Sequence, residues 1–214
     1  AVAAFREDGE TVEILNIMGK TFLKLNQQEN ALKCLNRANT MNSQNLHRLC
    51  ALAQANSELG DNEAAAAAIS TAEKFDGGST IVKETKVEVA VNSGDTATAK
   101  EVMQNLGALD QVVKYMNNRA ILLAREGEVD TSLELYKNAV RSLPKESGKE
   151  KNIVLYNLGM AYIRKGETKN AINILKKVDT DEKSMIVVKA KSLLGRAIEA
   201  ARVNAPLKLQ EKTK

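Results

Sequence analysis

Small side chains recur along this chain with a period of 34 residues. Gly19, Ala53 and Val87 lie 34 residues apart, and the series continues slightly out of step at Ala120 and Gly159. A second small residue follows each of them after 12 residues, at Ala31, Ala65, Ala99, Ser132 and Ala171. Such residues suit positions where two helices approach each other most closely. A period of this length predicts a solenoid, in which each repeat buries its apolar face against its neighbours.

Length and composition agree with an all-helical array. The chain has 214 residues, of which 43% are hydrophobic and 3% aromatic, with 2 prolines and no tryptophan. Alanine and leucine contacts between helices suit this composition better than a strand-rich core does. Because stacked repeats form one continuous core, we expect a single domain.

A glycine or asparagine separates two amphipathic stretches within each period. The last carbonyl groups of a helix find hydrogen-bond partners most easily when the residue just past the helix end is in the left-handed conformation. Glycine adopts this conformation freely and asparagine tolerates it. Each repeat is therefore predicted to be two helices joined by a short turn. The five turn residues are Asn26, Gly60, Gly94, Gly127 and Gly166.

The unit resembles the tetratricopeptide repeat, whose pattern is a large apolar residue, Leu-Gly, Tyr, Ala, an aromatic residue, Ala and Pro. The third repeat departs most from it, because Lys83 and Lys86 occupy positions that are normally apolar. The resemblance implies an all-α fold, a right-handed α-solenoid of antiparallel helix pairs. The fifth repeat is the closest copy, with Leu155, Leu158-Gly159, Tyr162, Ala171 and Leu175.

The resemblance divides the chain into five repeats and a capping helix. A long amphipathic helix over about 183–203 is expected to cover the apolar face of the last repeat. The whole would form one superhelical domain over 1–204, followed by a disordered tail over 205–214. The repeats are expected at about 12–45, 46–79, 80–112, 113–147 and 152–182. The apolar side of the capping helix is predicted to be Ile186, Ala190, Leu194, Ile198 and Ala201.

The residues offer little support for catalysis. His47 is the only histidine, and no third group to orient it accompanies the nearby Cys50. The glycine-rich stretch 76–80 lacks the Gly-Lys-Ser/Thr ending of a phosphate loop, so we expect a turn in which Ser79 or Thr80 caps the next helix. The acidic stretch 179–182 lacks the glycine of a calcium loop, and we expect it to cap the final helix. We therefore predict no enzyme activity, no cofactor and no metal.

The first helix of each repeat lines the concave face of a tetratricopeptide array, so the resemblance implies a groove along these helices. In the first three repeats it places there Glu13, Asn16, Lys20, Lys24, His47, Cys50, Gln54, Glu58, Glu84, Thr85, Glu88 and Asn92. In the later repeats and the capping helix it places the candidate partner-binding residues Lys114, Asn117, Asn118, Arg125, Tyr156, Asn157, Arg164, Lys189 and Arg196.

Two features of the second set point to a peptide ligand. Asn118 and Asn157 occupy equivalent positions in consecutive repeats, and an amide can both donate to and accept from an extended backbone. The second feature is a cationic cluster, which could bind the carboxylates of an acidic segment and consists of Arg125, Arg164, Lys189 and Arg196. The alternative interpretation is that the asparagines are ordinary exposed residues and that the cluster is a solvated basic face.

The groove does not match the two-carboxylate clamp with which some family members hold the C-terminus of a chaperone. Asn157 and Lys189 fit the clamp. Asn117, Ile121 and Leu193 stand where Lys, Asn and Arg are required. We therefore do not expect a co-chaperone of Hsp70 or Hsp90.

Charge is distributed unevenly along the chain. Residues 141–214 carry 17 Lys and Arg against 8 Asp and Glu, net +9, whereas residues 1–140 carry 14 against 19, net −5. Stacking aromatics are too sparse for a nucleic-acid surface, and no stretch approaches the roughly 18 apolar residues of a membrane-spanning helix. Cys34 and Cys50 lack the number and spacing of a disulfide framework, which favours a reducing compartment, the cytoplasm.

These observations predict an interaction scaffold that binds an extended or helical segment of a partner protein, with the C-terminal half preferring acidic sequence. The chain begins at Ala1 rather than methionine, so by analogy with the fold we expect it to belong to a larger bacterial signalling or assembly protein. The alternative is a structural module that forms homo-oligomers through its third repeat or its capping helix.

Overall fold

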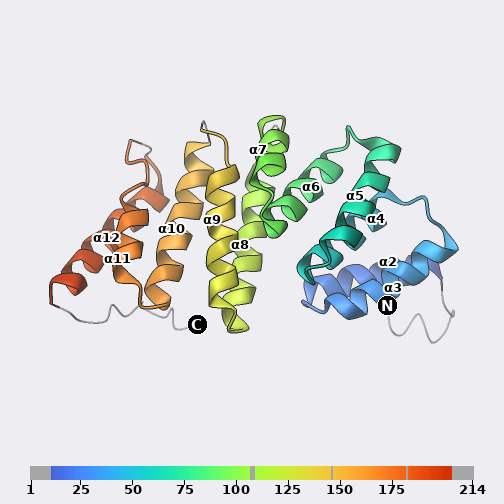
Figure 1. Ribbon diagram of the computed structural model, residues 1–214, viewed down its shortest axis with the longest axis horizontal. Helices are drawn as coiled ribbons and strands as arrows, with labels where there is room; N and C mark the ends of the chain where they lie inside the picture. Colours follow the sequence, from blue (N-terminus) through green and yellow to red (C-terminus); the bar gives the residue numbers. More distant parts are fainter. Residues whose placement is uncertain (1–10, 107–108, 146, 182, 204–214) are drawn as a thin grey trace. The chain divides into compact units, whose positions relative to one another are not determined.

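The computed structural model describes residues 11–106, 109–145, 147–181 and 183–203. These residues form eleven α-helices and no strand, which confirms the predicted all-α class (Figure 1). The chain divides into an N-terminal unit, Ala1–Thr98, and a C-terminal unit, Ala99–Lys214. The single superhelical domain stays a prediction, and the predicted tail over 205–214 lies outside the described residues.

The N-terminal unit consists of successive helix pairs. The two helices of each complete pair, α2 with α3 and α4 with α5, pack along each other. The first helices α2, α4 and α6 also pack against one another in that order, as stacked repeats require. Helix α7 begins in this unit and ends in the next. The helices are α2 (Val12–Lys24), α3 (Gln28–Met41), α4 (Leu46–Glu58), α5 (Asn62–Asp76), α6 (Thr80–Ser93) and α7 (Thr96–Gln104).

The C-terminal unit repeats this arrangement. Helix α8 pairs with α9 and α10 with α11, while the first helices α8, α10 and α12 pack side by side. These helices are α8 (Asp110–Arg125), α9 (Val129–Ser142), α10 (Gly148–Arg164), α11 (Thr168–Leu175) and α12 (Met185–Arg202). The repeats predicted at 12–45 and 46–79 each contain one helix pair. By contrast, α8 begins three residues before the predicted fourth repeat, and α10 begins four residues before the predicted fifth. Helix α12 lies within the predicted capping segment.

The periodic small residues lie where paired helices touch. A Cβ added to Gly19 would lie 2.5 Å from Leu35 Cγ, and one added to Gly159 would lie 2.7 Å from Leu175 Cδ2. Ser132 uses its hydroxyl at the equivalent crossing of α8 and α9, where it donates to the Ala120 carbonyl oxygen at 2.8 Å. The prediction of close helix approach from the 34-residue period is confirmed.

All five predicted turn residues adopt the left-handed conformation. The φ angles are 56° for Asn26, 82° for Gly60 and Gly94, 90° for Gly127 and 85° for Gly166. Because this conformation disfavours residues with a Cβ, these positions account for the regular glycine spacing.

The buried face of α12 agrees with the prediction only at Ala190. The structure also buries Val187, Leu193, Ala197 and Ala200, whereas Ile186, Leu194 and Ile198 are only half-buried and Ala201 is exposed. A helix turns by about 100° per residue, so neighbouring positions such as Leu193 and Leu194 face different surroundings. The difference arises because α12 packs on both α10 and α11, which the sequence pattern of α12 alone does not contain.

The acidic stretch before α12 does not cap that helix, so this prediction is wrong. The N-cap is Ser184. Asp179 is instead held by buried Asn152, which donates to the Asp179 carbonyl oxygen at 3.1 Å and accepts from its amide nitrogen at 2.8 Å. Ser79 does occupy the predicted N-cap of α6, although its side chain makes no capping hydrogen bond.

The third repeat accommodates its lysines at partly exposed positions. Lys83 and Lys86 are both half-buried, and Lys86 Nζ lies 2.7 Å from Glu73 Oε1 on α5. The aliphatic part of a lysine can cover apolar surface while its ammonium group stays near water. This explains how α6 packs on α4 and α5 without the usual apolar pattern.

Candidate functional site

A pocket of about 260 Å³ opens between α8, α9 and α10 in the C-terminal unit. Its walls combine small and apolar residues with amides, a phenol and a guanidinium group. Three of the nine predicted partner-binding residues line it, namely Asn117, Asn157 and Arg164. The other lining residues are Ala120, Ile121, Ala124, Val129, Ser132, Tyr136, Met160 and Ala161.

Three side chains from three helices form a hydrogen-bond network in this pocket. Asn117 Oδ1 on α8 accepts from Asn157 Nδ2 on α10 at 2.6 Å. The same oxygen accepts from the Tyr136 hydroxyl on α9 at 3.0 Å. The network therefore fixes the orientation of both amides and joins the fourth repeat to the fifth.

Tyr136 acts in this network as a neutral donor. Its side chain is only 4% exposed, and burial raises its pKa to about 12, although the nearby charge of Arg164 lowers it in part. A buried tyrosine hydroxyl needs a hydrogen-bond partner, which Asn117 supplies. Tyr136 matches the aromatic position of the repeat pattern, which predicts only packing, so the pattern gives no sign of its hydrogen bond at this site.

The network leaves one donor and one acceptor available. Among the described residues, neither Asn117 Nδ2 nor Asn157 Oδ1 takes part in a hydrogen bond. An amide carries two donor hydrogens and an acceptor oxygen, so both asparagines retain hydrogen-bonding capacity. This pair of groups has the polarity needed to accept from and donate to a peptide backbone.

The other predicted residues lie outside this pocket. Lys114, Asn118 and Arg125 are exposed on α8, Tyr156 is half-buried on α10, and Lys189 and Arg196 are exposed on α12. The repeat pattern places Asn118 and Asn157 at equivalent positions, but in the structure Asn157 bonds to Asn117. Adjacent residues of a helix point about 100° apart, so an equivalence in alignment does not ensure contact between two helices.

In the N-terminal unit, several predicted groove residues are buried between first helices. Cys50, Thr85 and Glu88 are buried rather than exposed, because α4 and α6 pack together along this face. Burial raises the pKa of Glu88 to about 8, opposed by its hydrogen bond from Gln54 and reinforced by the charges of Glu84 and Glu58. These groups therefore hold repeats together and do not offer an open surface.

The described residues contain no group of three or more His, Cys, Asp and Glu side chains that could hold a metal ion. Among the helices that the structure describes, none has the length and apolar character needed to cross a membrane.

Comparison with known proteins agrees with the helical geometry. The family model described as "Tetratricopeptide repeat" matches residues 12–45 and 154–180, the first and fifth repeats. A crystal structure of a tetratricopeptide repeat protein from Parabacteroides merdae ATCC 43184 resembles the fold, with a TM-score of 0.50 and 15% sequence identity. The likeness covers 92% of this chain and 75% of that one. No curated protein matches the sequence. The matched segments are therefore identified as tetratricopeptide repeats, and the left-handed turns and helix pairs of the other described segments are similar to them.

Proposed function

We propose that this protein binds a peptide segment of a partner protein without catalysing a reaction, and that the pocket between α8, α9 and α10 holds part of that segment. Tetratricopeptide repeats generally serve as protein-interaction scaffolds. The cytoplasm is the proposed compartment, and both cysteines are present as thiols.

The polarity of the two asparagines carries this proposal. Asn117 has an amide nitrogen to donate and Asn157 has an amide oxygen to accept, while their mutual bond of 2.6 Å holds both in place. A bound peptide needs both kinds of partner, since each residue brings one N–H and one C=O. Groups that are already oriented lose little entropy when the ligand binds.

Arg164 makes an acidic segment the preferred ligand. It lines the same pocket as the two asparagines and remains exposed. A guanidinium group can hold a carboxylate through two parallel hydrogen bonds. The C-terminal third of the chain adds a net charge of +9, which attracts acidic sequence over a longer range.

The apolar wall has room for one side chain of the ligand. Ile121, Ala124 and Met160 line the pocket, whose volume of about 260 Å³ exceeds the roughly 150 Å³ of an apolar cavity known to hold benzene. We therefore propose a segment with a large apolar residue next to Asp or Glu.

Fluorescence anisotropy can test this site. The probe is a labelled peptide with both ends blocked, in which a leucine is flanked by aspartates, and the comparison peptide carries lysines in place of the aspartates. Arg164→Glu should weaken binding of the acidic peptide by at least about tenfold, because it replaces attraction by repulsion. Asn157→Ala should weaken it further when the two substitutions are combined.

Arg125→Glu is the matched control, since it makes the same charge change on an exposed helix position outside the pocket. It should alter affinity far less than Arg164→Glu. The proposed site would be wrong if the two charge reversals lowered affinity equally. It would also be wrong if the variant that combines Asn157→Ala with Arg164→Glu kept the affinity of the parent chain.

The alternative of self-association has one observation in its favour. Met185 and Val188, one turn apart on α12, are 69% and 62% exposed. Apolar side chains grouped in this way suit a contact between protomers. Light scattering over a dilution series should show a dimer that Val188→Ser weakens, and a monomer at all concentrations would count against this alternative.

A further inference from the structure

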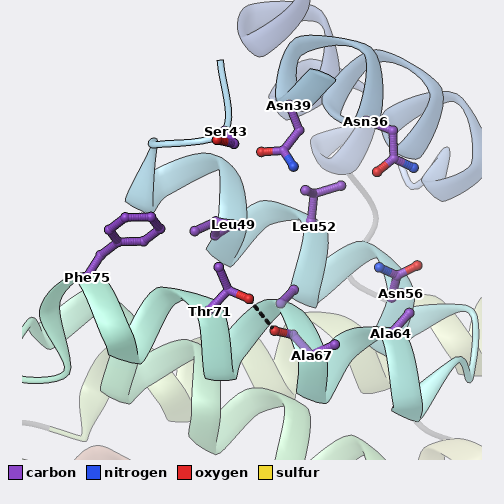
Figure 2. Close-up of a pocket in the computed structure, with 11 residues that line it drawn as sticks. Asn36, Asn39, Ser43, Leu49, Leu52, Asn56, Ala64, Ala67, Thr71 and Phe75 are labelled. Atoms are coloured by element: carbon purple, nitrogen blue, oxygen red, sulfur yellow. Dashed lines mark hydrogen bonds between the residues drawn. The ribbon is translucent and has the colours of Figure 1, made fainter. Parts of the chain in front are cut away.

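A second pocket, of about 410 Å³, lies in the N-terminal unit between α3, α4 and α5 (Figure 2). It is on the side of the second helices of the repeats, whereas the groove implied by the family resemblance runs along the first helices. Its lining residues are Asn36, Asn39, Ser43, Leu49, Leu52, Asn56, Ala64, Ala67, Ala68, Thr71 and Phe75.

The pocket is an elongated depression that is open to solvent, and it is called the channel below. Along α5 its wall runs from Ala64 to Phe75, 11 residues, which corresponds to about 16 Å at 1.5 Å per residue. This length fits about five residues of an extended chain at 3.3 Å each. The amides of Asn36 and Asn39 face this wall from α3, and Leu49 and Leu52 rise between them from α4 (Figure 2).

A buried arginine fixes the orientation of Asn39. Arg48 is 1% exposed, and its Nε donates to Asn39 Oδ1 at 3.3 Å while its Nη1 donates to Asn16 Oδ1 at 3.1 Å. A guanidinium group can only donate, so it holds the oxygen of Asn39 and leaves the amide nitrogen as the group that can serve a ligand. Asn39 therefore presents a donor to the channel.

The channel is otherwise uncharged. None of its 11 lining residues is Asp, Glu, Lys, Arg or His. A charged ligand side chain would lose hydration there without gaining a counter-charge. Phe75, which is 51% exposed at one end, and the leucines of α4 instead offer apolar contact.

Further hydrogen-bonding groups lie on the walls. Thr71 Oγ1 donates to the Ala67 carbonyl oxygen at 2.9 Å, so its lone pairs remain to accept a ligand N–H. Asn36 and Asn56 add amides that can donate or accept (Figure 2). Backbone N–H and C=O groups of an extended segment need such partners when they leave water.

We propose that this channel binds a short, uncharged, extended peptide segment, with one backbone carbonyl oxygen on Asn39 Nδ2 and one apolar side chain on Phe75. The site is separate from the acidic-peptide pocket of the C-terminal unit in position and in ligand chemistry. The protein would then carry two different peptide sites, one in each unit.

The test uses a display library of blocked peptides of about seven residues that lacks Asp, Glu, Lys, Arg and His. The library is selected on the full chain, and one recovered peptide is titrated against variants by fluorescence anisotropy. Phe75→Ser should weaken its binding by at least about tenfold, and Phe75 is exposed enough to be replaced without loss of core packing. Placing Asp or Lys at the centre of the peptide should weaken binding comparably.

Asn39→Asp tests the polarity of the site. The new carboxylate would pair with Arg48, so the fold is kept, but the donor becomes an acceptor that repels a peptide carbonyl. Binding should fall at least about tenfold while the thermal midpoint is maintained. Failure of the library to yield any binder, or unchanged affinity of the recovered peptide for both variants, would overturn the proposal.

Arg164→Glu separates this proposal from the proposed function. It should leave the uncharged peptide bound as tightly as before, and Phe75→Ser should leave the acidic peptide bound as before. Loss of uncharged-peptide binding in Arg164→Glu would place that peptide in the other pocket and overturn the channel.

Discussion

Gln54 and Glu88, 34 residues apart in the sequence, meet between α4 and α6 with 2.5 Å between Gln54 Nε2 and Glu88 Oε2. Ser57 and Asn92 repeat the arrangement about one turn further along, where Asn92 Nδ2 donates to Ser57 Oγ at 3.1 Å. Polar bonds one repeat apart thus join the first helices of the second and third repeats, on a face that the family resemblance assigns to ligand binding.

Glu88 should make the stability of the protein depend on pH. Its pKa is raised to about 8 in the folded chain, from an ordinary value near 4.5. Between these values the folded state holds a proton that the unfolded state has released, so the free energy of unfolding falls as pH rises. The slope should approach about 1.4 kcal/mol per pH unit within this window.

Glu88→Gln should remove most of this slope, because an amide imitates the protonated acid. Urea unfolding at several values between about pH 5 and pH 8 measures the difference. Glu63→Gln, an exposed carboxylate at the start of α5, is the control and should retain the slope of the parent chain. If the Glu88→Gln variant kept the slope of the parent chain, Glu88 would not be the cause of the pH dependence.

Gly159→Ala should destabilise the fifth repeat by about 1–3 kcal/mol, because the new methyl group would lie 2.7 Å from Leu175 Cδ2. Gly195→Ala on α12 is the matched control, since nothing lies within 4 Å of its added Cβ. It should be neutral or stabilise by up to about 1 kcal/mol through helix propensity. Denaturant unfolding measures the free energy of unfolding of both variants. A Gly159→Ala chain as stable as the parent chain would contradict the prediction.

Asn152→Ala should lower the free energy of unfolding by about 1–3 kcal/mol, since it leaves both backbone groups of Asp179 without their partner. Amide hydrogen exchange of Asp179, whose N–H bonds to Asn152 at 2.8 Å, should accelerate. Asn173→Ala, at an exposed position of α11, should change neither quantity. Equal exchange rates in the two variants would show that Asn152 does not hold the loop.

Lys86→Leu should raise the free energy of unfolding by about 0.5–1 kcal/mol. The substitution restores the apolar residue of the repeat pattern and removes an ion pair whose side chains are 33% and 38% exposed, which contributes little. Thermal unfolding measures the change. A loss of more than about 1 kcal/mol would mean that the Lys86–Glu73 pair matters more than its exposure suggests.

The periodic elements were the most predictable part of the protein. Gly19, Gly159 and the five turn residues are set by local geometry, which forbids a Cβ in a tight crossing or disfavours it in a left-handed turn. Such constraints act within one repeat, so they are visible as a regular pattern in the residues themselves.

Side-chain partners between repeats were much less predictable. Asn157 bonds to Asn117 and not Asn118. Helix α12 buries Leu193 and Ala197, whereas its apolar pattern predicts Leu194 and Ile198. Each depends on the rotation of one helix against another, and a rotation of about 100° moves the contact to the next residue.

The sequence by itself determined that the chain forms paired helices with a 34-residue period, because the demand for small residues is local and repeats. The tertiary structure alone decided which polar groups hold helices together and which keep hydrogen-bonding capacity at a pocket. Glu88 is buried against Gln54, whereas Asn117 Nδ2, Asn157 Oδ1 and Arg164 meet at one pocket. The reason is physical: hydrogen bonds and burial depend on distances between helices that are far apart along the chain.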